Sequence, residues 1–463
     1  MRTLKVSLLA AVILACFALV MANSVPNVPS NTWQATDSGS AARTGAAAVL
    51  LMDGRVLITG GTAGGAATAS AEVYSAASGF SPVASMLEAR SGHAAVVLQD
   101  GRVLVTGGDG GSGPSNSAEI YDPANDSWTP IGAMAAARSG HTATPLLDGS
   151  VLIAGGSGSS GLERYDVEGE NFYNAGSLSQ ARSGHAADLL NDGRVIIVGG
   201  RDGENALATV EIYDPATNDV TSAASLATAR SGHSATTALD GRVVVIGGKG
   251  ADGDLASIEI FDGTDWTTSS SSLTTARSGH MAVLLGWNHA ILVAGGVAGE
   301  NALASAELYR PWSGAVVGTG NMTIARNGAT AVSLEDEGLL QASGGSGDAS
   351  AELYGFATVK SDQFEYGPGQ TAHITGTGWV PGETVQLHLT EVPKTHDDHN
   401  YTAVADANGN ISASTYTFEL HDIGRKFFMT ATGSQSQAQA LFKDAPSADI
   451  DQCRNGSAAS AAN

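Results

Sequence analysis

The sequence predicts an all-β protein: a seven-bladed β-propeller followed by a small β-sandwich. Three markers recur seven times in the same order between residues 31 and 357: an Arg-x-Gly segment, a Gly-Gly pair and a Glu-x-aromatic segment. Successive Gly-Gly pairs lie 44 to 49 residues apart. Repeats of about this length are typical of propeller blades. The 59 glycines and the small charged fraction suit many short strands joined by tight turns.

Each repeat unit contains the signals of four strands. In the second unit, an apolar run at 94–99 is followed by Asp100-Gly101, a favoured hairpin turn, and then by a second apolar run at 102–108. After a glycine-rich loop, the segments 117–123 and 127–134 supply a third and a fourth strand. No segment shows a sustained helical period, so each unit is predicted to form one four-stranded blade.

The ends of the repeat region predict how the ring closes. The seventh unit lacks a fourth strand after its Glu-x-aromatic segment, and a spare strand, at 31–36, precedes the first Arg-x-Gly. We therefore expect the N-terminal strand to complete the last blade, which removes the free sheet edges.

The repeat resembles the kelch motif, with its double glycine, its Glu-x-Tyr strand and its later tryptophan. Trp128 and Trp266 hold the tryptophan position, Phe80 and Phe172 substitute for it, and the fourth unit has only Val220. Among enzymes, the resemblance includes copper radical oxidases of the galactose oxidase kind, whose cofactor joins a tyrosine to a cysteine. Because residues 17–452 contain no cysteine, we predict that this chemistry is absent.

Beyond the propeller, residues 358–443 lose the period and show short alternating segments separated by glycine and asparagine turns. This region resembles the immunoglobulin-like modules appended to secreted bacterial proteins. Residues 444–463 form a low-complexity tail that is predicted to be disordered. The lone Cys453 suggests either a partner outside the chain or a sequence that stops short of its natural end.

The N-terminus predicts export. Arg2 and Lys5 precede an apolar run, so residues 1–22 are predicted to be a signal peptide cleaved after Ala22, with 23–30 as a linker. A lipoprotein anchored at Cys16 is the alternative. We expect a secreted or cell-surface protein with no membrane span after cleavage. The net charge of −23 argues against nucleic acid as a partner, and the oligomeric state is left open.

The Arg-Ser-Gly-His group could suggest a catalytic site, but it recurs intact in five units. Catalysis needs one asymmetric constellation, so we assign no catalytic residues and no cofactor. We predict instead that repeated arginines pair with repeated glutamates and that these pairs tie strands together. The residues predicted to form these pairs are Arg90, Arg138, Arg182, Arg230 and Arg277, with Glu119, Glu163, Glu211, Glu259 and Glu307.

Two further segments of the sequence resemble ligand-binding motifs. The Gly-x-Gly-x-x-Gly match at 156–161 is followed by a predicted strand rather than the helix that a dinucleotide site needs. The segment at 396–399 gathers His396, Asp397, Asp398 and His399, which are reasonable ligands for zinc or copper. A solvated turn is the other interpretation of this segment, and it is the one we favour.

Function is expected where the units differ, which is in the loops after each Gly-Gly pair. These loops should share one face of the propeller and carry acidic groups there: Asp109, Asp202, Glu204, Asp252, Asp254 and Glu300. We predict a non-enzymatic binding protein that recognises a protein or a glycan through this face, with the sandwich as a spacer or adhesion module. The alternative is a carbohydrate-active hydrolase, lyase or epimerase on the same scaffold.

Overall fold

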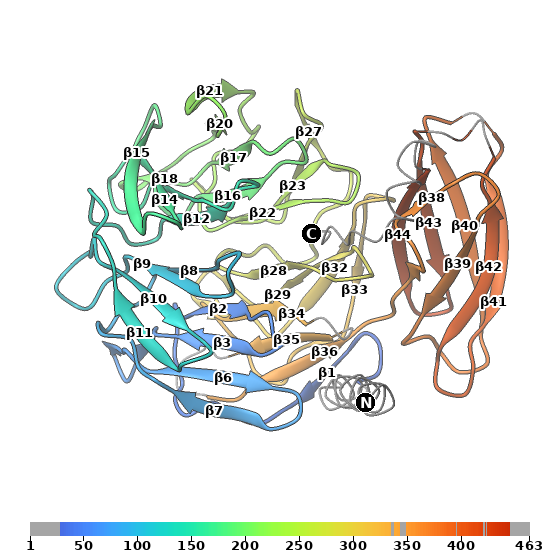
Figure 1. Ribbon diagram of the computed structural model, residues 1–463, viewed down its shortest axis with the longest axis horizontal. Helices are drawn as coiled ribbons and strands as arrows, with labels where there is room; N and C mark the ends of the chain where they lie inside the picture. The colour runs from blue at the N-terminus through green and yellow to red at the C-terminus, as the bar shows by residue number, and fades with distance from the viewer. Residues whose placement is uncertain are drawn as a thin grey trace, which may run out of the picture.

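The computed structural model describes residues 28–334, 338–342, 349–394, 396–419, 422 and 424–444. It contains seven four-stranded antiparallel sheets arranged as a ring, with a β-sandwich-like domain beside them (Figure 1). The predicted fold class is thus confirmed. The predicted signal peptide and nearly all of the predicted tail lie outside the described residues. Within the described ranges, no helix is long and apolar enough to cross a membrane.

The innermost strands of the seven blades contact one another in sequence and form a closed circle, because β34 contacts β2. They are β2 (Ala47–Leu50), β8 (Ala94–Val97), β12 (Thr142–Pro145), β16 (Ala186–Leu189), β22 (Ser234–Thr237), β28 (Met281–Leu284) and β34 (Thr330–Ser333). The second strands are β3 (Val56–Thr59), β9 (Val103–Thr106), β13 (Val151–Ala154), β17 (Val195–Val198), β23 (Val243–Ile246), β29 (Ile291–Ala294) and β35 (Gly338–Ala342).

The third and fourth strands complete each blade toward the rim. The third strands are β6 (Ala71–Ser75), β10 (Ala118–Asp122), β14 (Gly161–Asp166), β20 (Val210–Asp214), β26 (Ile258–Phe261), β32 (Ala306–Arg310) and β36 (Glu352–Gly355). The outer strands are β7 (Gly79–Val83), β11 (Ser127–Pro130), β15 (Asn171–Ser177), β21 (Asp219–Ala223), β27 (Trp266–Thr268), β33 (Ala315–Gly318) and β1 (Thr32–Ala35).

The hydrophobic core lies between neighbouring blades. From β3 to β29 the second strands are buried along their whole length, because a blade packs against each of their two faces. This explains why their sequences are continuous apolar runs, such as residues 195–198, rather than alternating ones. The packing of each blade therefore depends on both of its neighbours.

The ring is closed by the N-terminal strand. β1 pairs with β36 and is the outer strand of the seventh blade, with Trp33 opposite Tyr354. The two rings lie 4.9 Å apart, and the indole N–H of Trp33 donates to the carbonyl oxygen of Gly320 at 2.8 Å. Trp33 thus supplies the tryptophan that the C-terminal part of the last repeat lacks.

The loops after the Gly-Gly pairs contain structure that the sequence pattern did not predict. Four of them form two-stranded hairpins rather than plain loops. These are β4 (Thr62–Ala63) with β5 (Ala66–Ala67), β18 (Arg201–Asp202) with β19 (Asn205–Ala206), β24 (Lys249–Gly250) with β25 (Gly253–Asp254), and β30 (Val297–Ala298) with β31 (Asn301–Ala302). Such pairs of two residues are too short for a periodic signal. The segment 156–161 leads into the strand β14, not into a helix.

The C-terminal domain consists of two sheets around an aromatic core that includes Trp379, Phe418, Phe427 and Phe442. One sheet has the order β37 (Lys360–Ser361), β39 (Thr371–Gly376) and β42 (Ile411–Thr417). The other has the order β38 (Glu365–Tyr366), β44 (Gln437–Asp444), β43 (Lys426–Thr432), β40 (Thr384–Val392) and β41 (His399–Val404).

This domain docks on the turn between β28 and β29, where the repeat departs from its Asp-Gly pattern. Here the chain reads Gly286-Trp287-Asn288-His289. The side-chain amide of Asn288, which is 3% exposed, donates to the carbonyl oxygens of Ala357 at 2.6 Å and Gln437 at 2.9 Å. His289 Nδ1 lies 2.6 Å from the carbonyl oxygen of Gln439. The turn that lacks the Asp-Gly pattern is therefore the one that forms the interface between the two domains.

Replacing Asn288 with alanine is expected to loosen this interface. The substitution leaves two buried carbonyl groups without their donor, which costs about 1–3 kcal/mol. Limited proteolysis should then cut faster near residues 357–360, where the chain passes between the domains. Asn408→Ala, at an exposed turn, is the control and should leave cleavage unchanged. Equal cleavage of the Asn288 variant and the wild type would show that the turn does not hold the domains together.

Candidate functional site

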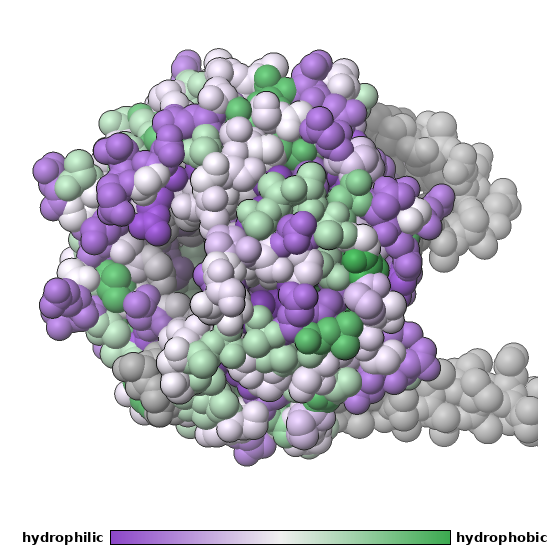
Figure 2. Space-filling view, turned by 90° about the vertical axis from the view of Figure 1, so that its left-hand side faces the viewer, coloured by the Kyte–Doolittle hydropathy of each residue, from purple (hydrophilic) through white to green (hydrophobic). Residues whose placement is uncertain are grey.

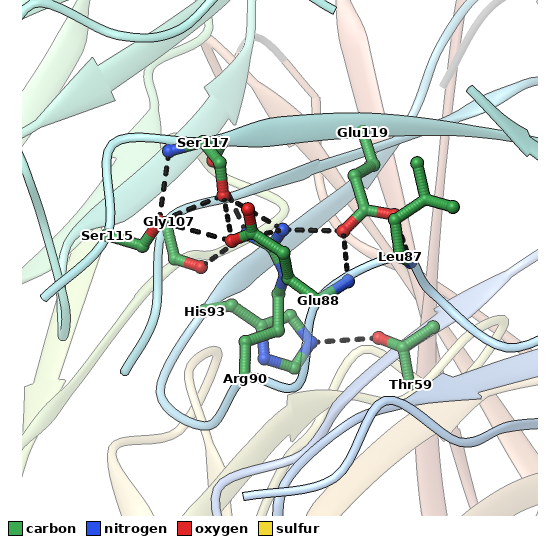
Figure 3. Close-up of polar contacts among 9 residues, drawn as sticks. All are labelled: Thr59, Leu87, Glu88, Arg90, His93, Gly107, Ser115, Ser117 and Glu119. Carbon is green, nitrogen blue, oxygen red and sulfur yellow. Dashed lines mark hydrogen bonds and ion pairs between the residues drawn. The ribbon is translucent and has the colours of Figure 1, made fainter. Parts of the chain in front are cut away.

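Each blade contains a buried arginine–glutamate pair that joins the segment before its inner strand to its third strand. In blade 2, shown in Figure 3, Arg90 Nη2 lies 2.6 Å from Glu119 Oε1. Arg90 Nη1 donates to the carbonyl oxygen of Gly107 at 2.6 Å. The same carboxylate accepts the amide of Leu87 at 2.6 Å, so one pair fixes three segments of the blade.

The pairing is the same in all seven blades. The distances between the paired atoms range from 2.5 to 3.3 Å, and every arginine is at most 1% exposed. The pairs are Arg43–Glu72, Arg90–Glu119, Arg138–Glu163, Arg182–Glu211, Arg230–Glu259, Arg277–Glu307 and Arg326–Glu352. These side chains belong to the scaffold, because each is held by its own blade and none faces solvent.

The histidine of each Arg-Ser-Gly-His segment packs between blades. His93 Nε2 lies 2.9 Å from Thr59 Oγ1 of the preceding blade, and His141 Nε2 lies 2.8 Å from Thr106 Oγ1. A Cβ on Gly107 would lie 2.8 Å from His141 Cε1, so glycine is required where the imidazole approaches. Burial lowers the pKa of these imidazoles to about 3, and they are therefore neutral at pH 7.

A belt of glycines links the blades around the central channel. The glycine of each Arg-x-Gly segment has a φ of 58° to 64°, in the left-handed region that favours glycine. Its amide donates to the carbonyl oxygen of the corresponding glycine in the preceding blade at 2.9 to 3.3 Å in six of the seven blades. The glycine belt consists of Gly45, Gly92, Gly140, Gly184, Gly232, Gly279 and Gly328.

Directly before each belt glycine stands a residue with a neutral hydrogen-bonding side chain. These seven residues, here called the polar ring, are Thr44, Ser91, Ser139, Ser183, Ser231, Ser278 and Asn327. The post-Gly-Gly loops adjoin the ring, since Ser183, Ser231 and Ser278 form β-bridges to Arg201, Lys249 and Val297. The Arg-x-Gly segments and the variable loops therefore share one face of the propeller, here called the loop face.

The acidic residues predicted for the loop face differ in their surroundings. Asp202, Glu204, Asp252 and Glu300 are exposed. Asp254 instead joins two blades, because its carboxylate accepts Ser278 Oγ and the amide of Gly299, both at 2.6 Å.

Asp109 accepts the amides of Gly111 and Gly113 and so orders its own loop. Figure 2 shows hydrophilic residues spread around the edge of this view, with hydrophobic residues in small groups nearer its middle.

The four candidate metal ligands at 396–399 do not converge on one point. Asp398 pairs with Lys394 at 2.9 Å, and Asp397 is exposed. The ring of His399 lies 5.0 Å from that of Tyr416. His396 turns toward Glu391, with Nδ1 3.0 Å from Oε2. These four residues were adjacent in sequence, but the start of β41 at His399 sends their side chains in different directions.

One notable residue was not singled out from the sequence. Asp188 is the only charged residue in the seven inner strands. Burial raises the pKa of its carboxyl group. Its oxygens accept the amide of Thr237 in the next blade at 2.6 Å and that of Leu189 at 2.9 Å. The signal available in the sequence was a charge inside an otherwise uncharged repeated strand.

Comparison with known proteins agrees with this architecture. The Kelch motif model matches residues 89–135 and 182–227, and the Macroglobulin-like domain model matches residues 357–443. The β-sandwich expected after the propeller is therefore a macroglobulin-like domain. No curated protein sequence matches the chain.

Among solved structures, a fungal alcohol oxidase of the AA5 family in complex with copper has a TM-score of 0.59 and 16% identity. The match covers 91% of this chain and 100% of that chain. At this identity the likeness concerns the fold. The chain contains kelch motifs in a seven-bladed β-propeller whose fold is like that of this alcohol oxidase, followed by a C-terminal β domain that matches the macroglobulin-like model.

Proposed function

We propose that this protein is a secreted, non-enzymatic binding protein that recognises a glycan on its loop face. The observation that carries the proposal is the polar ring with its exposed acidic neighbours. Hydroxyl, amide and carboxylate groups are suited to exchanging hydrogen bonds with the many hydroxyls of a sugar. Asp202 and Glu204 lie beside this ring on the hairpin that Ser183 contacts.

The distribution of titratable groups supports binding over catalysis. Active sites gather residues whose pKa is strongly shifted in one asymmetric cluster. In the described part of the propeller, the buried histidines and every buried arginine except Arg164 instead repeat from blade to blade and serve packing. A cofactor made from a cysteine and a tyrosine has no cysteine available between residues 17 and 452.

Asp188 is the observation that favours the alternative, a carbohydrate-active enzyme on the same scaffold. Its carboxyl pKa is raised by burial, which suits a general acid. However, both of its oxygens accept backbone amides from the channel wall. That arrangement fits the joining of two blades better than proton transfer to a substrate.

A glycan array probed with chain lacking residues 1–22 tests the proposal, with product formation followed in parallel. We expect binding without turnover. The double substitution Asp202→Asn with Glu204→Gln should weaken binding by about 10-fold or more, since one hydrogen bond to a charged group contributes about 1.5–3 kcal/mol.

The matched control is Asp192→Asn. It lies in the same blade, on the Asp-Gly turn at the opposite end of the inner strand, and should leave affinity unchanged. Absence of any glycan ligand would refute the proposal. Turnover that is lost in Asp188→Asn would establish the enzymatic alternative.

A further inference from the structure

A carboxylate occupies a core position at the end of β40. Side chains along this strand alternate between buried and more exposed positions, and Val385, Leu387 and Leu389 take the buried ones. Glu391 is next in this series, and its side chain is only 7% exposed. Burying a carboxylate where the pattern calls for an apolar residue is costly unless charged or polar groups meet it.

Two other potential metal ligands converge on Glu391. Asp422 is fully buried, and His396 places Nδ1 3.0 Å from Glu391 Oε2. One ligand atom from each of the three residues lies within 4.8 Å of the other two. The side chain of His396 is 37% exposed, which gives the cluster a route to solvent.

Neighbouring groups orient the two carboxylates. Arg425 Nε lies 2.9 Å from Glu391 Oε1, the oxygen that does not face His396. Tyr416 donates its hydroxyl to Asp422 Oδ2 at 2.8 Å, and the amide of Glu419 donates to the same oxygen at 2.7 Å. Hydrogen bonds to the ligands from a second layer of residues are a regular feature of metal sites. They fix ligand orientation before the ion arrives.

We infer that Glu391, His396 and Asp422 form a zinc site in the macroglobulin-like domain. One imidazole nitrogen with two carboxylate oxygens is a donor set that zinc accepts, with a fourth position left for water. With zinc–ligand bonds near 2.1 Å, ligand atoms in a tetrahedral site lie about 3.4 Å apart. The 3.0 Å between His396 Nδ1 and Glu391 Oε2 is close to this value, and all three ligand atoms lie within 4.8 Å of one another. The bound ion joins the end of β40 to the segments that carry His396 and Asp422.

Calorimetric titration of the untagged, chelator-treated chain with zinc chloride tests the inference. We expect one zinc ion per chain at this site. His396→Ala should weaken that binding on the order of 100-fold, since it removes the nitrogen ligand. Tyr416→Phe removes only the hydrogen bond that orients Asp422 and should weaken binding by about 10-fold.

His388→Ala is the matched control, because His388 is an exposed histidine of the same strand that carries Glu391. It should bind zinc like the wild type. Thermal melting without zinc establishes that each variant is folded. Absence of zinc binding by the wild type, or equal binding by His396→Ala and the wild type, would overturn the inference.

Discussion

Replacing Arg182 with alanine is expected to destabilise the propeller by about 3–5 kcal/mol, because it leaves a buried glutamate without its counter-charge. Arg182 is fully buried, and its Nη2 lies 2.6 Å from Glu211 Oε2. Its Nη1 also donates to the carbonyl oxygens of Gly199 and Thr209 at 2.8 and 3.0 Å. Thermal melting followed by circular dichroism should show a midpoint lowered by about 5 °C or more.

Arg194→Ala is the matched control in the same blade. Arg194 also pairs with an aspartate, Asp192, at 2.6 Å, but the two side chains are 41% and 50% exposed. Exposed pairs contribute about 0–1 kcal/mol, so this variant should melt close to the wild type. If both variants melt alike while Arg182→Ala loses ligand binding, the arginine–glutamate pairs serve function rather than stability.

A second variant separates the charge from the packing. Arg182→Met combined with Glu211→Leu removes both members of the pair and fills the site with apolar side chains. Replacing a buried ion pair in this way is often neutral or stabilising. We therefore expect the double variant to be more stable than Arg182→Ala alone. This result would show that Arg182→Ala lowers stability mainly because it leaves the carboxylate of Glu211 buried without a counter-charge.

The fold could be predicted from the sequence because successive blades place the same types of residue at the same packing positions. The Gly-Gly pair is needed wherever a histidine approaches from the next blade, as His141 approaches Gly107. Constraints that repeat at a fixed spacing leave a period that is visible without a structure. The seven sheets follow directly from that period, whereas the β domain after them was predicted from the short alternating segments that begin where the period stops.

Features that occur once leave no such period. The turn at 286–289 is recognised as the domain interface only when Asn288 is seen to contact Ala357 and Gln437. The cluster around Glu391 joins residues 391, 396 and 422, whereas adjacency in the sequence had suggested residues 396–399. Loop-face residues such as Glu204 are exposed. They therefore show neither the regular spacing nor the burial of the packing residues, and their pattern does not identify a ligand.

Lowering the pH below about 6.5 is expected to destabilise the propeller steeply, because buried histidines cannot take up protons. His93, His141, His185 and His233 are 7–8% exposed, and burial lowers their pKa to about 3. In the unfolded chain their pKa is about 6.5. Between these values the unfolded state binds more protons, so the stability present above pH 6.5 is lost as the pH falls.

The expected loss is large because five groups act together, since burial also lowers the pKa of His280 to about 3. Each contributes about 1.4 kcal/mol per pH unit once the pH is well below 6.5, which gives roughly 7 kcal/mol per unit for the five. The geometry of the site also indicates that the buried histidines resist protonation. Nδ1 of His141 and of His185 has no hydrogen-bond partner among the described residues. Protonation would place an unsatisfied N–H in the packed interior. Urea unfolding from pH 7.5 to 4.5 measures the slope.

The chain itself supplies the control substitution. Blades 1 and 7 carry Ala46 and Ala329 where the other five blades carry histidine, so alanine is compatible with this position of a blade. His185→Ala should be less stable than the wild type at pH 7.5, because it leaves a cavity. Its further loss on acidification should be smaller by about one histidine's share. An unchanged pH slope in this variant would assign the acid sensitivity to other groups and leave the histidines with packing alone.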